Sequence, residues 1–252
     1  CSSDLGPTMK TLDQVEPRIP ITAANADSPD LPYRILEPGS YYLEGDRHCN
    51  NYGITIDADN VTLDLNGYSL IGPGSGINTG VMVSGSNVEI KNGTIRRFGT
   101  GLYIGNSNHG CRFTRVRVMS NTGMGIRITS NDHIVKDCII GENGSTGLSA
   151  EGSSMMIDEN TVYKNQRTGI YVDADSIVRG NVVHNNQEDG IRSGTNCHVI
   201  NNVSHHNNWY GIATASGCLI SNNTSSNNNS DGIVTFDSRV LGNPVSDNAF
   251  QP

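Results

Sequence analysis

The feature that most constrains this chain is a glycine followed by an apolar residue, which recurs every 21 to 24 residues. The glycines of this series are Gly80, Gly101, Gly125, Gly147, Gly169, Gly190, Gly211 and Gly232. Gly53 begins the series one longer step earlier, and the extra residues fall in the glycine-rich segment 72–76. A fixed period of this length is typical of solenoids, in which each repeat covers its apolar side only by stacking on its neighbours. We expect segment 72–76 to be a surface insertion in the stack.

Two series of asparagines follow the same period. The first lies four residues before the coil glycine, at Asn121, Asn143, Asn165, Asn186, Asn207 and Asn228, and the second comprises Asn160, Asn181, Asn202 and Asn223. At a strand separation of about 4.8 Å, each carboxamide can donate a hydrogen bond to one neighbour and accept one from the other. The sequence therefore predicts two asparagine ladders at the inner bends of the stack.

Between the asparagines, apolar and outward residues alternate with period two, as in Ile126-Arg127-Ile128 and Ile170-Tyr171-Val172. No long stretch after residue 50 follows the helical period of 3.6 residues, so short parallel strands are indicated throughout. We predict an all-β chain that forms a single-stranded parallel β-helix of about ten coils with an N-terminal cap.

The chain divides into three expected parts within a single domain: an N-terminal tether at 1–7, a cap at 8–52 and the parallel β-helix at 53–252. Within the cap, 8–15 is expected to be a short amphipathic turn or helix, and 33–36 and 41–43 are expected to be strands. At the other end, either the final residues fold over the open coil or a partner covers it.

The composition of the chain limits the classes of partner that we expect. The formal net charge is -8 and no basic stripe offsets it, so nucleic acid is not an expected partner. No apolar run approaches the roughly 18 residues of a transmembrane helix. Cys1, which precedes Ser-Ser-Asp, resembles the lipidated first residue of a mature bacterial lipoprotein, although an incidental cysteine or a bond to Cys49 stays open. We expect a secreted or cell-surface protein, with a lipid anchor at Cys1 as one possibility.

Metal and cofactor sites are only weakly indicated. The six cysteines lack paired Cys-x-x-Cys spacing, so zinc is not expected. Cys197 and Cys218 share one position in successive coils and predict two neighbouring buried thiols or a disulfide. The Asp-x-Asp pairs at 57–59 and 173–175 leave calcium possible, although such pairs in tight turns usually bond their own backbone. Tyr163, His184 and His205 also share one position, and stacked side chains are expected there rather than a metal site.

Some of these motifs carry a family resemblance. The Gly-Ile and Asn-Asn spacing over residues 53–248 resembles the right-handed parallel β-helix repeat proteins of the pectate-lyase-like superfamily. The segments Met9-Lys10-Thr11-Leu12 to Gly39-Ser40-Tyr41-Tyr42-Leu43 and Val61-Thr62-Leu63-Asp64-Leu65-Asn66-Gly67 are similar to uncharacterised secreted bacterial members. The resemblance implies a right-handed helix whose long sheet face can bind polysaccharide.

The outward residues of the Gly-apolar strands can be read coil by coil, because successive side chains of a strand point to opposite faces. The first outward row contains Tyr103, Arg127, Tyr171 and Arg192, and a second row two residues later contains Glu151 and Asp173. The turns that lead into these strands add Arg167, Asp189, Trp209 and Tyr210. Together these side chains predict a polar and aromatic strip over the middle coils, suited to an extended acidic polysaccharide.

The resemblance also implies a chemistry for the strip. Related polysaccharide lyases neutralise a uronate carboxylate and abstract the C5 proton, which assigns Arg192 or Arg127 to neutralisation and Tyr171 to the role of base or acid. The other strip and turn residues named above would bind substrate. The preferred interpretation is a lyase that acts by β-elimination on a uronate-containing polysaccharide. The alternatives are a non-catalytic carbohydrate-binding or scaffold module and a uronate C5-epimerase, although the Asp-Pro-His motif of mannuronan epimerases is missing.

Overall fold

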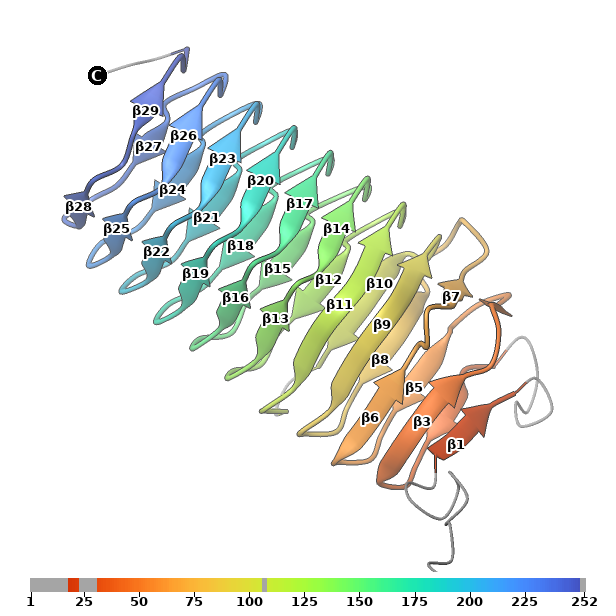
Figure 1. The fold of residues 1–252 in the computed structure, drawn as a ribbon. Helices are drawn as coiled ribbons and strands as arrows, with labels where there is room; N and C mark the ends of the chain where they lie inside the picture. Colours follow the sequence, from red (N-terminus) through yellow and green to blue (C-terminus); the bar gives the residue numbers. More distant parts are fainter. Residues whose placement is uncertain (1–17, 23–30, 106–107, 250–252) are drawn as a thin grey trace, which may run out of the picture.

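The computed structural model describes residues 18–22, 31–105 and 108–249, which wind into a solenoid of short parallel strands (Figure 1). No helix occurs among these residues. The strands form a ten-stranded sheet and a 19-stranded sheet, and every pairing between neighbouring coils is parallel. Each coil contributes one strand to the ten-stranded sheet, so the stack has ten coils, which confirms the predicted fold class.

The ten-stranded sheet contains the strands that follow the repeat glycines. Its strands, in spatial and chain order, are β2 (Tyr33–Ile35), β5 (Ile54–Ile56), β8 (Thr79–Val83), β10 (Thr100–Ile104), β12 (Ile126–Ile128), β15 (Leu148–Ala150), β18 (Ile170–Val172), β21 (Ile191–Ser193), β24 (Ile212–Thr214) and β27 (Ile233–Val234).

The 19-stranded sheet consists of two banks of strands that meet at a bend. The first bank contains β1 (Arg18–Ile21), β3 (Gly39–Leu43), β6 (Val61–Asp64), β13 (Ile134–Lys136), β16 (Met156–Asp158), β19 (Ile177–Arg179), β22 (His198–Ile200), β25 (Leu219–Ser221) and β28 (Arg239–Leu241). The second bank contains β4 (Arg47–His48), β7 (Ser69–Ile71), β14 (Ile139–Gly141), β17 (Thr161–Tyr163), β20 (Val182–His184), β23 (Val203–His205), β26 (Thr224–Ser226) and β29 (Val245–Ser246). The two longest strands, β9 (Glu89–Arg96) and β11 (Arg112–Met119), run through both banks.

Three bends close each coil, and from the coil that begins at β8 onward each bend places one residue in the left-handed region. In the coil that begins at β18, these residues are Asp175, Asn185 and, between the banks, Gly180, with φ angles of 56°, 58° and 65°. Asn, Asp and Gly tolerate this conformation better than other residues do. The frequent Asn and Asp in the sequence are therefore partly a requirement of the bends.

Both predicted asparagine ladders are present. Along the first, the Nδ2 of each asparagine donates to the Oδ1 of the next at 2.9–3.1 Å, from Asn121 to Asn248. The second runs from Asn160 to Asn243 at 2.9–3.0 Å, and the backbone N–H of Cys138 donates to its first rung. Each ladder thus continues one coil beyond the predicted series.

A third column at the remaining bend uses mixed acceptors. Backbone N–H groups donate to the next coil's His133 Nδ1, Ser176 Oγ, Cys218 Sγ and Ser238 Oγ at 3.1, 3.1, 3.4 and 3.1 Å. Cys197 and Cys218 are therefore neighbouring buried thiols rather than a disulfide. Burial raises the pKa of Cys197 to about 11, so this thiol is held as a structural group.

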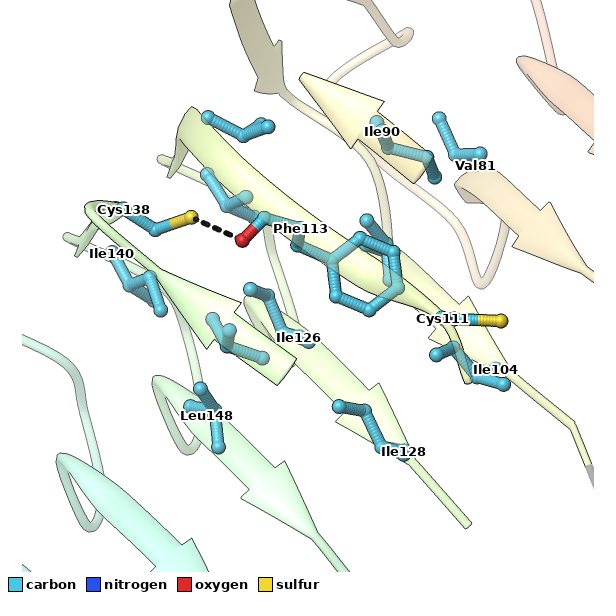
Figure 2. Close-up of a cluster of buried hydrophobic side chains, with 14 of the residues drawn as sticks. Val81, Ile90, Ile104, Cys111, Phe113, Ile126, Ile128, Cys138, Ile140 and Leu148 are labelled. Atoms are coloured by element: carbon cyan, nitrogen blue, oxygen red, sulfur yellow. Dashed lines mark hydrogen bonds between the residues drawn. The ribbon is translucent and has the colours of Figure 1, made fainter. Parts of the chain in front are cut away.

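Inward side chains from the ten-stranded sheet and from both banks of the 19-stranded sheet fill the interior of the solenoid. Figure 2 shows Phe113 pointing into this interior together with Ile90, Ile126 and Ile128. Cys138 lies at the edge of the same layer, where its Sγ donates to the carbonyl of Phe113 at 3.6 Å. The outward side chains are free of this packing, so the surface can vary while the core stays regular.

The stack begins before the first repeat glycine. The segments expected to be strands of the N-terminal cap form β2 and β3, which pair in register with β5 and β6, so 33–43 belongs to the first coil. The tether at 1–7, Cys1 and the expected turn or helix at 8–15 lie outside the described residues. At the other end, β28 and β29 are exposed throughout, and they are the last strands before 250–252, which are also outside the description.

Candidate functional site: the outward strip of the ten-stranded sheet

The predicted outward row exists as one unbroken column of side chains. Neighbouring strands align Tyr103 with Arg127, Arg127 with Ser149, Ser149 with Tyr171, and Tyr171 with Arg192. We call these five residues, together with Glu151 and Asp173 beside them, the strip. At about 4.8 Å per strand, the row is roughly 19 Å long, which suits an extended oligosaccharide.

Arg127 lies at the centre of a connected group. Its Nε and Nη2 donate to the two carboxylate oxygens of Glu151 at 2.9 and 3.0 Å, and its guanidinium carbon lies 6.0 Å from the centre of the Tyr103 ring. Ser149 Oγ donates to the same carboxylate at 3.3 Å. Because a guanidinium has five N–H donors, this fork–fork pairing fixes Arg127 and leaves three donors for a ligand.

Tyr171 lies between Ser149 and Arg192 in the row. Burial and the negative charge of Asp173 raise its pKa above the usual 10, and the positive charge of Arg192 only partly offsets them. The phenol is therefore protonated near neutral pH. Tyr171 is suited to donate a hydrogen bond or a proton, and poorly suited to the role of base.

Arg192 is held by a carboxylate beneath it. Its Nη1 donates to Asp189 Oδ2 at 3.3 Å, and the backbone N–H of Tyr210 donates to Asp189 Oδ1 at 3.2 Å. The side chain of Asp189 is 1% exposed, whereas that of Arg192 is 55% exposed. Asp189 was predicted to contact substrate from the rim of the strip. In the structure its carboxylate is buried and orients Arg192.

A groove opens beside Arg127 that the sequence did not reveal. It has a volume of ≈ 380 Å³ and is lined by Ile77, Thr100, Met124, Ser145 and Arg127 together with nearby turn glycines. Ile77 follows the glycine-rich segment 72–76 and is 93% exposed. The longer first step of the repeat was the only sequence feature that pointed here: the insertion forms part of the rim of the groove.

The turns before the strands continue this rim toward the C-terminal coils. Trp209 is half-exposed and, with Asn208, Tyr210, Asn229 and Ser230, lines a second hollow of ≈ 350 Å³. Arg167 is exposed on the turn before β18. The structure thus places Arg167, Trp209 and Tyr210 along one edge of the ten-stranded sheet, as predicted, rather than on the strip itself.

The residues considered for metal binding have other partners. Asp57 accepts from Arg34 at 2.6 Å, and Asp173 accepts from the N–H of Ala174 at 2.9 Å. Tyr163, His184 and His205 stack at 5.6 and 5.0 Å between ring centres. No group of three or more potential ligands gathers among the described residues.

A family comparison decides the classification. The model of the right-handed β-helix region matches residues 79–218, which is more than half of the chain. The chain belongs to the right-handed β-helix family. The expected handedness of this β-helix protein is thereby confirmed, and no curated protein sequence gives a match. None of its described residues forms a helix long and apolar enough to cross a membrane.

Solved structures with the same fold include two epimerases and a tailspike protein. The A-module of the mannuronan C-5 epimerase AlgE4 from Azotobacter vinelandii has a TM-score of 0.71 at 18% identity, over 84% of this chain and 70% of the module. The periplasmic alginate epimerase AlgG has a TM-score of 0.58 at 12% identity, over 92% and 84%. The Dettilon tailspike protein has a TM-score of 0.66 at 15% identity, over 90% and 52%. At these identities the likeness concerns the fold of the β-helix protein.

Proposed function

We propose that the protein is an extracellular β-helix that binds an acidic polysaccharide along the strip. The observation that carries this proposal is the in-register row from Tyr103 to Arg192, in which two arginines and two tyrosines face solvent on five adjacent strands. The alginate epimerases with the same fold act on an acidic polysaccharide, which supports the choice of a uronate chain.

The strip is suited to recognition because its charged groups are already oriented. Glu151 and Asp189 hold Arg127 and Arg192 while leaving both arginine side chains about half-exposed. A uronate carboxylate can accept from the remaining N–H groups without displacing those partners, and charge-assisted hydrogen bonds of this kind are the stronger ones. Tyr103 and Tyr171 add hydroxyl donors and apolar ring surface for the sugar.

A lyase that acts by β-elimination is the second candidate, and the adjacency of Tyr171 and Arg192 favours it. In this reaction Arg192 would neutralise the uronate carboxylate, the carboxylate of Asp173 would accept the C5 proton as the C4–C5 double bond forms, and Tyr171 would protonate the oxygen that leaves C4. The raised pKa of Tyr171 argues against this residue as the base. A C5-epimerase needs the same proton abstraction, and the missing Asp-Pro-His motif makes it the weaker enzymatic alternative.

Calorimetric titration with alginate and pectate oligosaccharides, and with a neutral glucan as reference, tests binding. We expect Arg127→Gln to weaken binding of the uronate chains about tenfold, through the loss of charge-assisted hydrogen bonds, and Arg239→Gln to leave it unchanged. Arg239 is the matched control because it is exposed on β28 of the other sheet. Absence of binding to every uronate chain, or equal loss in both variants, would contradict the proposal.

Product analysis of the same mixtures separates binding from catalysis. Ultraviolet absorbance of unsaturated uronates reports elimination, and NMR of the C5 proton in deuterated water reports epimerisation. If the protein is a lyase, Tyr171→Phe removes the absorbance while binding persists. Binding without either product identifies a non-catalytic module.

A further inference from the structure

Five arginines lie on or directly after the two longest strands of the other sheet, away from the strip. Arg96 and Arg97 lie at the end of β9, and Arg112, Arg115 and Arg117 lie on β11. None of them forms an ion pair with the part of the chain that the structure describes. The pairing of β9 with β11 places Arg112 opposite Glu89, Arg117 opposite Thr94 and Arg96 opposite Met119, so the arginines are spread along the two strands and form no continuous basic stripe.

Two of these arginines line one pocket. The pocket has a volume of ≈ 290 Å³ and lies at the bend between the two banks, where it is lined by Gly67, Asn92, Gly93, Thr94, Arg115 and Arg117. We call it the arginine pocket. A side chain at Gly67 would meet nothing within 4 Å, so this edge of the pocket is open to solvent.

Arg115 is oriented by its neighbours in the bend. Its φ is 54°, and its Nε donates to Asn92 Oδ1 at 2.9 Å. Asn92 in turn donates from Nδ2 to Asp64 at 3.3 Å, and Asp64 is already paired with Arg18 at 3.0 Å. The carboxylate at the end of this series of hydrogen bonds, that of Asp64, is therefore already paired with Arg18. Both terminal amino groups of Arg115 are left for a ligand.

Arg117 follows Arg115 with only the buried Val116 between them. Its neighbours across the strands are Thr94 and Ile139, which carry no charge. Two guanidinium groups therefore line one pocket, and no carboxylate of the described residues lies within ion-pair distance of either. Their mutual repulsion is relieved by an anion, which a fork of N–H donors binds in a bidentate manner.

We propose that the arginine pocket binds a single oxyanion group, namely a sulfate, phosphate or carboxylate. Arg115 and Arg117 supply the charge, and Thr94, which lines the same pocket, can add a hydroxyl as a further donor. The next residues of the Arg115 bend column are Asp137 and Glu159, so the positive region ends after two coils. This limits the ligand to one charged group, carried by a small molecule or by one sugar of a glycan, and disfavours a long polyanion.

Calorimetric titration of the full protein with sodium sulfate, sodium phosphate, glucuronate and alginate oligosaccharides tests the proposal and separates the two sources of the anion. The variants Arg115→Asn and Arg117→Thr take residues that the chain already uses at the equivalent positions of β9, Asn92 and Thr94, so the bend and strand are preserved. We expect either variant to weaken binding of the anion about tenfold or more.

Two control variants distinguish binding at the arginine pocket from nonspecific electrostatic attraction of the anion. Arg112→Gln removes an equal charge from β11 at a position outside the pocket and is expected to change the affinity less than twofold. Arg127→Gln alters the strip and is expected to leave this site intact, so the result does not depend on the proposed function. The proposal is overturned if wild-type protein binds none of the four probes, or if Arg112→Gln weakens binding as much as the pocket variants do.

Discussion

At the scale of single residues, His133 shows how one side chain can carry a bend. It is 1% exposed, and its Nδ1 accepts from the backbone N–H of Cys111 at 3.1 Å. Its Nε2 therefore carries the proton of the neutral ring and donates to Ser130 Oγ at 2.8 Å. A second proton on Nδ1 would face an N–H donor, and burial lowers the pKa of His133 to about 4.

This arrangement predicts a loss of stability in acid. The unfolded chain, with an ordinary histidine pKa near 6.5, binds more protons between pH 6.5 and 4 than the folded chain does. The contribution of neutral His133 is therefore complete above pH 6.5 and is lost as the pH falls through this window, by roughly 3 kcal/mol. Urea denaturation at pH 7 and pH 4 measures the change.

The variant His133→Ser isolates this effect, because Ser176 accepts the equivalent backbone bond two coils further along the stack. We expect the variant to be less stable than wild type at pH 7, but to lose less stability on acidification. His198→Gln, at an exposed position, is the control. Parallel pH profiles for wild type and His133→Ser would show that another group is responsible.

At the scale of elements, the asparagine ladders connect the coils through buried side chains. Asn181 accepts from both the backbone N–H and the Nδ2 of Asn160, and donates to the carbonyls of Ile157 and Arg179 and to Asn202. Every hydrogen-bonding position of this carboxamide is used. Loss of one rung leaves buried donors and acceptors on both neighbouring coils without a partner.

We expect Asn181→Ala to lower the free energy of unfolding by about 2–4 kcal/mol, because each buried group left without a partner costs about 1–3 kcal/mol. The matched control is Asn208→Ala, which removes an exposed carboxamide and is expected to cost less than about 0.5 kcal/mol. Urea unfolding curves compare the two variants. Equal midpoints would mean that water or a local shift of the bend replaces the lost bonds.

The sequence predicted the elements better than it predicted their environment. Both asparagine ladders follow from spacing alone, because identical residues recur at one position. The third column was not recognised as a ladder, since His133, Ser176 and Cys218 accept the same kind of bond with different chemistry. The strip residues were placed in the correct row, but the burial of Asp189 depends on the turn of the next coil, which period-two alternation does not describe. The arginine pocket likewise depends on a pairing between strands.

At the scale of the whole molecule, the stack is a series of coils in contact only with their neighbours. In the middle coils the inward side chains are covered on both sides, and Val178, Val183 and Val199 are fully buried. In the last coil that the structure describes, β28 is less buried, with Val240 47% and Leu241 44% exposed. Because stability in such a stack is a sum of coil and interface terms, the last coil is expected to open without the rest.

Hydrogen–deuterium exchange measures this gradient. We expect the amides of β28 to exchange at least roughly tenfold faster than those of β19, which occupies the same bank three coils earlier. Both strands are three residues long, so the comparison is matched in length. Uniform exchange from β19 to β28 would instead show that the solenoid unfolds as one cooperative unit.

The near-constant repeat has a consequence for how such a gene can change. A duplication of 21 or 22 codons adds one complete coil, with a new rung in each ladder, and lengthens the binding row by one strand. An insertion of one codon within a strand would turn the inward residues that follow it in that strand to the surface, whereas segment 72–76 shows that extra codons at a turn are absorbed. Growth by whole coils and variation at turns are therefore the paths by which this molecule can be remodelled without loss of its fold.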